Sequence, residues 1–379
     1  SEGHGFCGLS RKTLLQILQG RCRELGVDLN FETEVESIDA FADADLIVAC
    51  DGINSRIREQ YADHFQPALD WRRCRFTWLG TEKPLDAFTF IFRESEHGLF
   101  QVHAYPFQKD LSTFIVECHE DVWRCAGLDQ ASEEETIAYF EELFAPDLDG
   151  HRLIANRSLW RQFPTVRNAH WHHRNIVLLG DAAHTAHFSI GSGTKLAMED
   201  AIALRDAVVA HEGAAMPEIL EAYREARWVD AAKLQKTAQT SLEWFENSRR
   251  YLGQDPLQLS FNLLTRSKRI TYENLEMRDP AFIGRVRDWY REHVGAPLSS
   301  GGQSPPPMFT PFRLRDLELA NRIVVSPMCQ YSATDGLVGE WHLVHLGSRA
   351  VGGAGLVIAE MTDVSRDGRI TPGCAGMYL

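Results

Sequence analysis

Asn175-Ile-Val-Leu-Leu-Gly-Asp-Ala-Ala-His184 begins the stretch of sequence that decides the fold, and the stretch continues through His187-Phe-Ser-Ile-Gly-Ser-Gly-Thr-Lys195. An apolar segment ends at Gly-Asp, a glycine-rich turn follows, and an alanine-rich segment then predicts a helix. Gly191 and Gly193 lack side chains, so a flat ring can approach the backbone, and free amides at a helix start can bind polar ring atoms. Asp181 follows its strand, where open α/β sheets bind ligands. We therefore predict an α/β fold with a cofactor site here.

A second stretch, Asp45-Leu-Ile-Val-Ala-Cys-Asp-Gly-Ile-Asn-Ser-Arg-Ile-Arg58, repeats the order of strand, Asp-Gly and helix. Both stretches resemble the internal flavin-contacting motifs of the FAD-dependent aromatic monooxygenases, the para-hydroxybenzoate hydroxylase-like family. The resemblance implies FAD, with NAD(P)H close to the Asp-Gly of the second stretch. The residues that it assigns to FAD are Asp51, Gly52, Arg58, Gly180, Asp181, Gly191, Ser192, Gly193, Thr194 and Lys195. A surface ion pair is an equally simple role for Arg58.

The start of the chain departs from the family's pattern. Relatives open with a strand, a Gly-x-Gly-x-x-Gly turn and a helix that bind the pyrophosphate, and no such turn precedes Asp51. The chain begins without methionine and enters a helical pattern at Arg11, with Ser10 as its expected N-cap. In relatives an arginine at this place can face the flavin nucleotide, which adds Arg11 to the FAD set; a solvated arginine is the alternative. We expect a fragment that lacks the first βαβ unit.

Between the two motifs the sequence changes to aromatic and β-branched segments separated by turns, which predicts strands at 75–80, 87–92, 98–107 and 111–118. These segments predict an antiparallel sheet within about residues 70–165. In the resembled family such a sheet forms the floor of the aromatic substrate pocket. Trp78, Phe90, His103 and Tyr105 are candidate substrate contacts, and packing in the sheet core is the simpler role for each one.

The rest of the chain suggests a long helix, a linker and a second domain. Apolar residues repeat at three and four positions over residues 217–245, which predicts a helix that packs one face. Residues 295–307 are rich in Gly, Ser and Pro and predict a linker. The predicted domains are therefore an FAD-dependent monooxygenase domain at 1–294, the linker at 295–307, and a second domain at 308–379.

The second domain resembles the start of the old yellow enzyme family of FMN-dependent (β/α)8 barrels. The match includes Asn321-Arg-Ile, a strand, Ser326-Pro-Met-Cys329 and then Tyr331. In relatives this strand end lies against FMN, the cysteine tunes the flavin potential and the tyrosine faces substrate, which makes Cys329 and Tyr331 the implied catalytic residues. The implied FMN contacts are Ser326, Pro327, Met328, Cys329 and Met361. A buried inert thiol is the alternative for Cys329. Such barrels need about 250 residues, so we expect only the N-terminal part of one.

Composition argues against several other classes of function. A net charge of −14 argues against a nucleic-acid partner, and no apolar run predicts a membrane span. The eight cysteines contain no Cys-x-x-Cys pair, and His184 and His187 lack the spacing of helical metal ligands. We therefore expect free thiols, a cytoplasmic location and no metal site.

An FAD monooxygenase linked to an FMN barrel resembles the bifunctional aromatic acyl-CoA monooxygenase/oxidoreductases, which act on salicylyl-CoA or 2-aminobenzoyl-CoA. His187 and Phe188 support this resemblance, because many monooxygenases have two prolines there. It implies hydroxylation of an aromatic acyl-CoA with NAD(P)H and O2 at the FAD site, followed by reduction at the FMN site. A homo-oligomer is compatible with it. Two alternatives remain: a monooxygenase of a free phenol or indole with an independent reductase domain, and an inactive flavoprotein fragment.

Overall fold

A computed structural model describes residues 8–155 and 157–378, which fall into two compact units that divide between Ile270 and Thr271. Within these described residues, no helix combines the length and apolar character that crossing a membrane requires. The short 3-10 helices are η1 (Ile38–Phe41), η2 (Gly180–Ala182), η3 (Phe188–Ile190), η4 (Ser248–Tyr251), η5 (Pro307–Phe309) and η6 (Arg366–Gly368).

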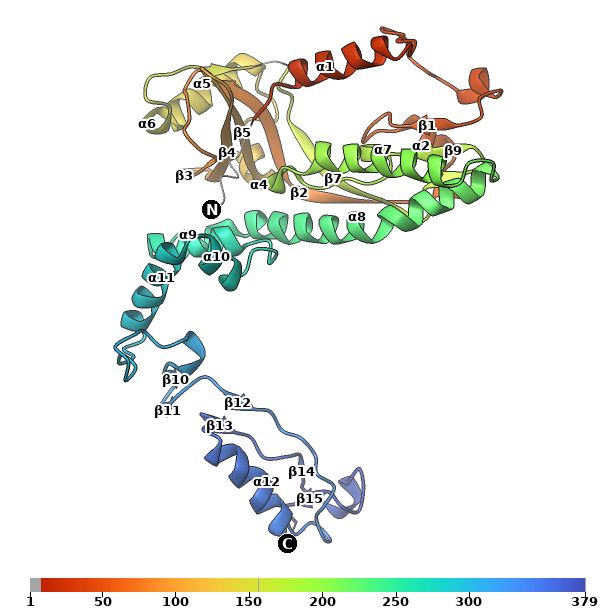
Figure 1. Ribbon diagram of the computed structural model, residues 1–379. Coiled ribbons are helices and arrows are strands. Elements are labelled where there is room, and N and C mark those ends of the chain that lie inside the picture. Colours follow the sequence, from red (N-terminus) through yellow and green to blue (C-terminus); the bar gives the residue numbers. More distant parts are fainter. Residues whose placement is uncertain (1–7, 156, 379) are drawn as a thin grey trace. The chain divides into compact units, whose positions relative to one another are not determined.

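The first unit contains a small parallel sheet that both motifs help to build. Strand β1 (Ile47–Ala49) pairs in parallel with β9 (Ile176–Leu178), and β8 (His172–His173) pairs antiparallel with β9. Helices α7 (Gly193–Ala210) and α8 (Met216–Glu246) follow and lie side by side (Figure 1). They bury an apolar cluster with β9 that includes Val177, Leu204 and Tyr223. The strand, turn and helix predicted for residues 175–204 are confirmed.

Three further helices precede the antiparallel sheet in the chain. Helix α1 (Arg11–Glu24) begins after Ser10, whose hydroxyl accepts a hydrogen bond from the Thr13 amide at 3.1 Å, so the predicted N-cap is confirmed. Helices α2 (Arg56–Gln60) and α3 (Ala62–Phe65) follow Asp51-Gly52 in the chain.

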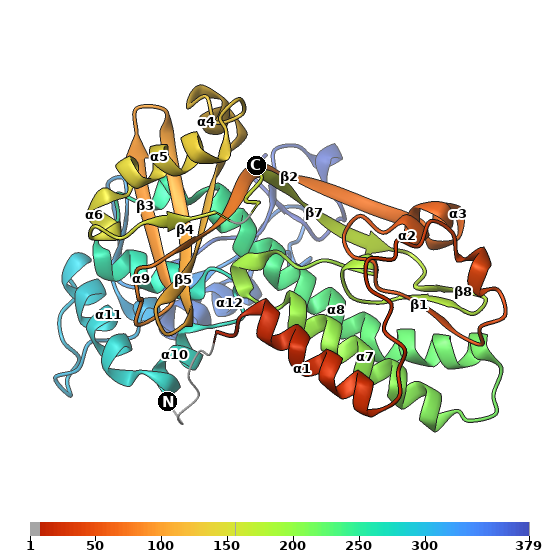
Figure 2. The same ribbon diagram turned by 90° about the horizontal axis from the view of Figure 1, so that it is seen from above.

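The predicted antiparallel sheet is confirmed. Its strands are β2 (Pro67–Thr81), β3 (Thr89–Ser95), β4 (Gly98–Gln108), β5 (Leu111–His119), β6 (Leu153–Ile154) and β7 (Arg161–Asn168). They lie in the order β3-β4-β5-β2-β6, and β7 pairs with the first half of β2. Figure 2 shows β2 and β7 running from this sheet toward β1 and β8, so one long strand reaches from the antiparallel sheet to the parallel sheet.

Strand alternation gives the antiparallel sheet two different faces. Phe114 and Val116 of β5 face a core closed by α5 (Glu133–Leu143) and α6 (Ala145–Leu148). On the other face, Glu117 of β5 lies close to His187 at the start of η3, and His103 of β4 contacts Phe245 at the end of α8. Helices α4 (Glu120–Cys125) and α9 (Pro256–Thr265) complete the unit.

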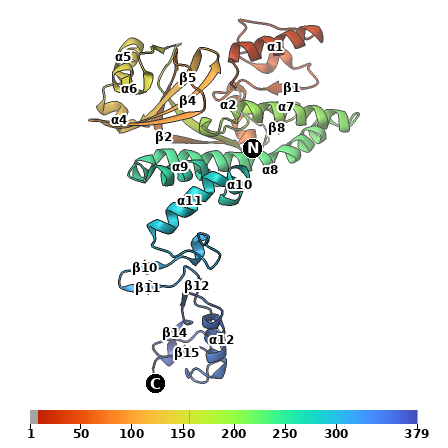
Figure 3. The ribbon, with the colours of Figure 1, turned by 60° about the vertical axis from the view of Figure 1, so that its left-hand side comes forward.

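The second unit contains a strand-helix-strand element. Strands β12 (Val324–Val325) and β13 (Leu356–Val357) are parallel neighbours, and α12 (Glu340–Val351) connects them and contacts β13 (Figure 3). The remaining elements are α10 (Tyr272–Arg278), α11 (Pro280–His293), the hairpin of β10 (Phe312–Leu314) and β11 (Leu317–Leu319), and the parallel pair β14 (Thr362–Asp363) and β15 (Ala375–Gly376).

Candidate active site

The two Asp-containing motifs meet at one edge of the parallel sheet. Ala49 of β1 lies opposite Leu178 of β9, so the chain segments that follow both strands leave the sheet at the same edge. Asp51 and Asp181 are both solvent-exposed at these strand ends. Gly180 has a φ of 62°, and a Cβ there would lie 3.1 Å from the Cβ of Ala197. Glycine at this position therefore lets the turn approach α7 closely.

Arg58 joins the two motifs from inside the protein. Its side chain is buried, and its guanidinium donates hydrogen bonds to the carbonyl of Ala182 at 3.1 Å and of Ile53 at 2.6 Å. Burial lowers the pKa of Arg58, and Asp51 opposes that shift. The alternative of a surface ion pair is therefore wrong for Arg58, which bonds to backbone carbonyls. Its predicted contact with FAD remains a prediction.

The flavin residues predicted within residues 180–195 line the turn before α7. Partial desolvation by neighbouring atoms raises the pKa of the exposed Asp181, while His184 and Arg11 oppose the shift, which places Arg11 near this carboxylate. Gly191 has a φ of 62° with open space around its Cβ position. Ser192 and Gly193 are half-buried, whereas Thr194 and Lys195 are exposed at the start of α7. Lys195 pairs with Glu199 one turn further along.

These residues fit a flavin nucleotide. Asp181 offers a carboxylate that can accept hydroxyl hydrogen bonds, Arg11 offers a nearby cation, and the glycine turn leaves room for a flat ring. The first amides of α7 have no intrahelical partner, so they can donate to an anionic or carbonyl group.

A buried charged cluster supports the turn from behind. Asp200 of α7 accepts hydrogen bonds from Arg227 Nε at 2.9 Å and from the Gly180 amide at 3.3 Å. His184 Nε2 lies 2.9 Å from the same carboxylate, and Asp200 is fully buried. Burial raises the pKa of Asp200, but His184 and Arg227 outweigh it, so the pKa is below its ordinary value. The cluster fixes Gly180 relative to α7 and α8.

The turn before α7 also packs against the antiparallel sheet. The ring centroid of Phe188 lies 4.9 Å from Phe76, 6.0 Å from Trp78 and 5.3 Å from His103. Phe90 lies 5.2 Å from His103. The structure thus brings together Trp78, Phe90 and His103, three of the four predicted substrate contacts, beside Phe188.

The fourth predicted contact, Tyr105, belongs to a neighbouring aromatic pair. Its ring stacks on Phe88 at 5.2 Å, and burial raises the pKa of its hydroxyl group. Trp78 is 46 % exposed, so the aromatic surface beside Phe188 is open to solvent at this residue.

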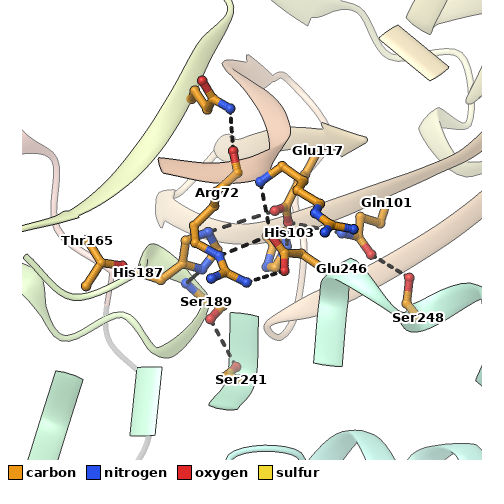
Figure 4. A network of polar contacts seen from close by, with 12 residues as sticks. Arg72, Gln101, His103, Glu117, Thr165, His187, Ser189, Ser241, Glu246 and Ser248 are labelled. Atoms are coloured by element: carbon orange, nitrogen blue, oxygen red, sulfur yellow. Dashed lines mark hydrogen bonds and ion pairs between the residues drawn. The ribbon is translucent and has the colours of Figure 1, made fainter. Parts of the chain in front are cut away.

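Glu117 is the centre of a buried polar network beneath this aromatic surface (Figure 4). Its Oε2 accepts hydrogen bonds from Gln101 Nε2 at 3.1 Å and lies 3.1 Å from His103 Nε2. Its Oε1 lies 3.8 Å from His187 Nε2. Burial raises the pKa of Glu117, but His103, His187 and Gln101 outweigh it, and the pKa is lower than usual. The contacts with two histidines and an amide donor therefore favour the ionised form of the carboxylate.

The same network holds η3 in place. His187 Nδ1 accepts a hydrogen bond from the Ser189 amide at 3.3 Å, and burial lowers the pKa of His187 to about 4. Arg266 donates to the Ser189 carbonyl at 2.9 Å and to Ser241 Oγ at 3.0 Å. Three parts of the protein thus fix the position of the segment that leads to Gly191. They are the antiparallel sheet, helix α8 and the segment after α9.

Sequence reasoning missed Glu117 and Arg266. A signal for Glu117 was available, because a carboxylate within the apolar segment 111–118 must face away from the residues that alternate with it into the core. Arg266 follows α9, and nothing in the local sequence indicates its contact with Ser189.

The predicted FMN residues of the second unit also gather at strand ends. Ser326, Pro327, Met328 and Cys329 follow β12, and Met361 follows β13 after three residues. The two segments are tied together by a hydrogen bond from the Gln330 amide to Glu360 Oε2 at 2.8 Å. Their position at adjacent parallel strand ends fits a ring placed across that edge.

Cys329 is half-buried, and Tyr331 is 50 % exposed with a φ of 52°. The pKa of Tyr331 is raised, mainly because Cys329 lies close to it. His342 and His345 are buried on α12, and His342 Nε2 lies 2.9 Å from Glu360 Oε1. The burial of both side chains and the contact of His342 with Glu360 are consistent with structural roles on α12. Among the described residues, no group of three His, Cys, Asp or Glu side chains is arranged to hold a metal ion.

Two parallel strands that present Asp-Gly and Gly-Asp turns beside an antiparallel sheet define a flavin-binding enzyme fold. Comparison with known proteins agrees: residues 40–238 match the FAD binding domain family, and residues 307–379 match the NADH:flavin oxidoreductase / NADH oxidase family. The chain belongs to the FAD-dependent monooxygenase family.

Individual relatives are consistent with this assignment. Salicyloyl-CoA 5-hydroxylase of a Streptomyces species is 42 % identical over 345 residues, covering 88 % of this chain and 64 % of the relative. The 3-hydroxy-4-methyl-anthranilyl-(aryl-carrier protein) 5-monooxygenase of Streptosporangium sibiricum is 38 % identical over 269 residues, covering 70 % of each protein. The chain thus spans less than two thirds of the Streptomyces enzyme.

A solved structure shares the fold. A mutant of 2-methyl-3-hydroxypyridine-5-carboxylic acid oxygenase superposes with a TM-score of 0.51 at 18 % identity, covering 71 % of this chain and 70 % of that chain. This likeness shows a shared α/β fold.

Proposed function

We propose that this chain is part of a bifunctional flavoenzyme that hydroxylates an aromatic acyl-CoA thioester with NAD(P)H and O2. The observation that carries the proposal is the packing of Phe188 on Phe76 and Trp78 of the antiparallel sheet. Phe188 precedes the glycine turn at Gly191, where we expect the flavin to bind. A flat aromatic substrate fits such a surface, because offset and edge-to-face ring contacts are favourable.

Two relatives support a carried acyl group over a free acid. One is named for a salicyloyl group on CoA, and the other is named for an anthranilyl group on a carrier protein. The net charge of −14 gives no general attraction for a polyanion, so recognition of CoA would depend on local groups.

The residues of the chain would hold and shield the reaction. Asp181, Arg11 and the amides at the start of α7 would hold FAD, which supplies activated oxygen when it is bound and reduced. Phe76, Trp78 and Phe188 would orient the substrate ring. The buried Glu117 network keeps η3 in one position. A fixed site from which the bound substrate excludes water would favour transfer of oxygen to the ring over release of hydrogen peroxide.

For the second unit we propose an FMN-dependent oxidoreductase module in the first part of a (β/α)8 barrel. The parallel β12-α12-β13 element supports this proposal, since it is the repeating unit of such barrels. Cys329 and Tyr331 would lie beside FMN, which supplies hydride chemistry when it is bound and reduced by NAD(P)H, and the module would then reduce a dearomatised product.

The test compares substrates in protein loaded with FAD. NAD(P)H oxidation, hydrogen peroxide and hydroxylated product are measured with salicyloyl-CoA, 2-aminobenzoyl-CoA, free salicylate and indole. We expect product with a CoA thioester and mainly hydrogen peroxide or no turnover with the free acid. Hydroxylated product with free salicylate or indole would support the alternative, a monooxygenase that acts on a free phenol or indole. No flavin uptake and no turnover would leave an inactive fragment.

A further inference from the structure

A cavity of about 200 Å³ lies between the end of β7, α8 and the segment after η2. Trp171, Trp228 and Ala232 form its apolar walls. Trp171 is buried and Trp228 is 43 % exposed, so the cavity extends from the interior to the surface. The two indole centroids are 6.3 Å apart, with an angle of 67° between the rings. Because an apolar cavity of about 150 Å³ holds benzene, this cavity has room for one aromatic ring.

Two amide side chains present acceptors on the inner side of the cavity. Asn168 donates through Nδ2 to the carbonyls of Ala182 and Ala183, and its Oδ1 is buried without a partner in the described residues. Gln235 donates through Nε2 to two other backbone carbonyls, and no hydrogen bond reaches its Oε1 from the part of the chain that the structure describes. Since carbonyls only accept, these bonds fix the orientation of both amides and leave both side-chain oxygens as acceptors.

His184 adds a third acceptor. It lines the cavity, is 2 % exposed, and its ring centroid lies 4.8 Å from that of Trp171. Its Nε2 is 2.9 Å from Asp200 Oδ2, and the carboxylate favours the ring proton on this nitrogen. Nδ1 therefore carries a lone pair, and it is buried without a hydrogen bond in the described chain. Leaving buried acceptors unpaired is unfavourable, so the inner wall favours a ligand that donates hydrogen bonds.

Arg167 gives the outer side of the cavity the opposite character. It lines the cavity and is exposed, and among the described residues its side chain makes neither an ion pair nor a hydrogen bond. A guanidinium binds a carboxylate through two parallel N–H donors. The cavity thus combines acceptors at its buried end, aromatic walls and an arginine at its exposed end.

We propose that this cavity binds a small aromatic carboxylate that carries an amino group, an aminobenzoate being the simplest example. The amino group has two N–H donors for the acceptors of Asn168 and His184, whereas a hydroxyl group has one. The ring lies against the two indoles, where edge-to-face contacts are favourable, and the carboxylate pairs with Arg167. The cavity shares no lining residue with the aromatic surface beside Phe188, so the inference does not depend on the proposed function.

The experiment is isothermal titration calorimetry of the chain with three ligands. 4-Aminobenzoate places an amino group and a carboxylate at opposite ends of one ring, benzoate lacks the donor, and aniline lacks the carboxylate. We expect 4-aminobenzoate to bind with one molecule per chain. Benzoate and aniline should each bind at least about ten-fold more weakly, because each loses one polar contact.

Two pairs of variants locate the binding site. Ala232→Leu fills the cavity from α8 and should abolish binding, whereas Ala226→Leu makes the same change at an exposed position of the same helix and should bind as the parent does. Arg167→Met should weaken binding of 4-aminobenzoate about ten-fold or more and leave aniline unchanged. Arg161→Met, at an exposed arginine of β7 that does not line the cavity, is its control and should bind as the parent does.

Failure to bind 4-aminobenzoate would overturn the inference and leave the cavity to water. Equal affinities for the three ligands would also overturn it, because neither polar end would then be recognised. Arg161 lies opposite Phe76 in the sheet, so loss of binding in Arg161→Met but not in Arg167→Met would place the ligand at the aromatic surface instead. If Ala232→Leu does not fold, the comparison of the two arginine variants decides the site.

Discussion

At the scale of single residues, Arg58 determines how the two motifs are joined. Its guanidinium pairs with the buried backbone carbonyl of Ala182 and the partly buried backbone carbonyl of Ile53. Arg58→Met keeps much of the apolar stem but leaves both carbonyls without this donor. Because each unpaired buried group costs roughly 1–3 kcal/mol, we expect the free energy of unfolding to fall by about 2–4 kcal/mol.

The matched control for Arg58 is on the same helix. Arg56 pairs with Glu34 at 2.6 Å, but both side chains are more than half exposed. Exposed ion pairs contribute roughly 0–1 kcal/mol, so Arg56→Met should have little effect. Urea unfolding of both variants measures the difference. Equal losses in the two variants would show that the bonds from Arg58 do not stabilise the junction.

At the scale of elements, the position of η3 depends on the neutral form of His187. Its Nδ1 accepts from the Ser189 amide, which a protonated imidazole cannot do. Burial lowers the pKa of His187 to about 4, against about 6.5 when unfolded. The unfolded state therefore binds more protons between these values, and stability falls as pH drops from about 6.5 to 4.

Substitution of His187 tests this pH dependence. A shift of that size corresponds to roughly 3 kcal/mol at most. His187→Gln removes the titrating group, so the variant should lose less unfolding free energy than the parent between pH 6.5 and 4. Urea unfolding at several pH values provides the comparison. Parallel curves for parent and variant would contradict the role given to His187.

Elements were easier to predict from sequence than the contacts between them. The helix from Arg11, the strands of the antiparallel sheet and the long helix α8 follow from periodicity and turn residues, which act locally. The network around Glu117 joins β4, β5, η3, the C-terminal half of α8 and η4. Its members are up to 147 residues apart, as with Gln101 and Ser248, so local patterns carry little information about it.

In the candidate site, too, the local segments were predicted and the contacts between them were not. Asp51 and Asp181 were found because both follow apolar segments, and parallel pairing of β1 with β9 places them at one edge. The burial of Arg58 was not predicted, since its two carbonyl partners come from different motifs. Glu117 could have been found from strand alternation, but its pairing with His103 and His187 depends on tertiary packing.

At the scale of the whole molecule, the FAD site proposed for the first unit and the FMN site proposed for the second can be tested one at a time. Asp181 lies at the FAD motif of the first unit, and Cys329 lies after β12 in the second. Asp181→Ala would remove the proposed charge-assisted hydrogen-bond partner of a flavin hydroxyl group, and such a bond is worth about 1.5–3 kcal/mol. We expect FAD affinity to fall about ten-fold or more, with FMN content unchanged.

Cys329→Ala is the reciprocal change in a protein loaded with both flavins. A thiol beside the ring affects its oxidised and reduced forms differently, so its removal should shift the FMN potential more than FMN binding. Aromatic hydroxylation at the FAD site should remain close to that of the parent. Spectroelectrochemistry of both flavins, with hydroxylated product counted in parallel, measures each effect. An unchanged FMN potential would make Cys329 an inert thiol, whereas loss of hydroxylation would mean that the two units act as one catalytic system.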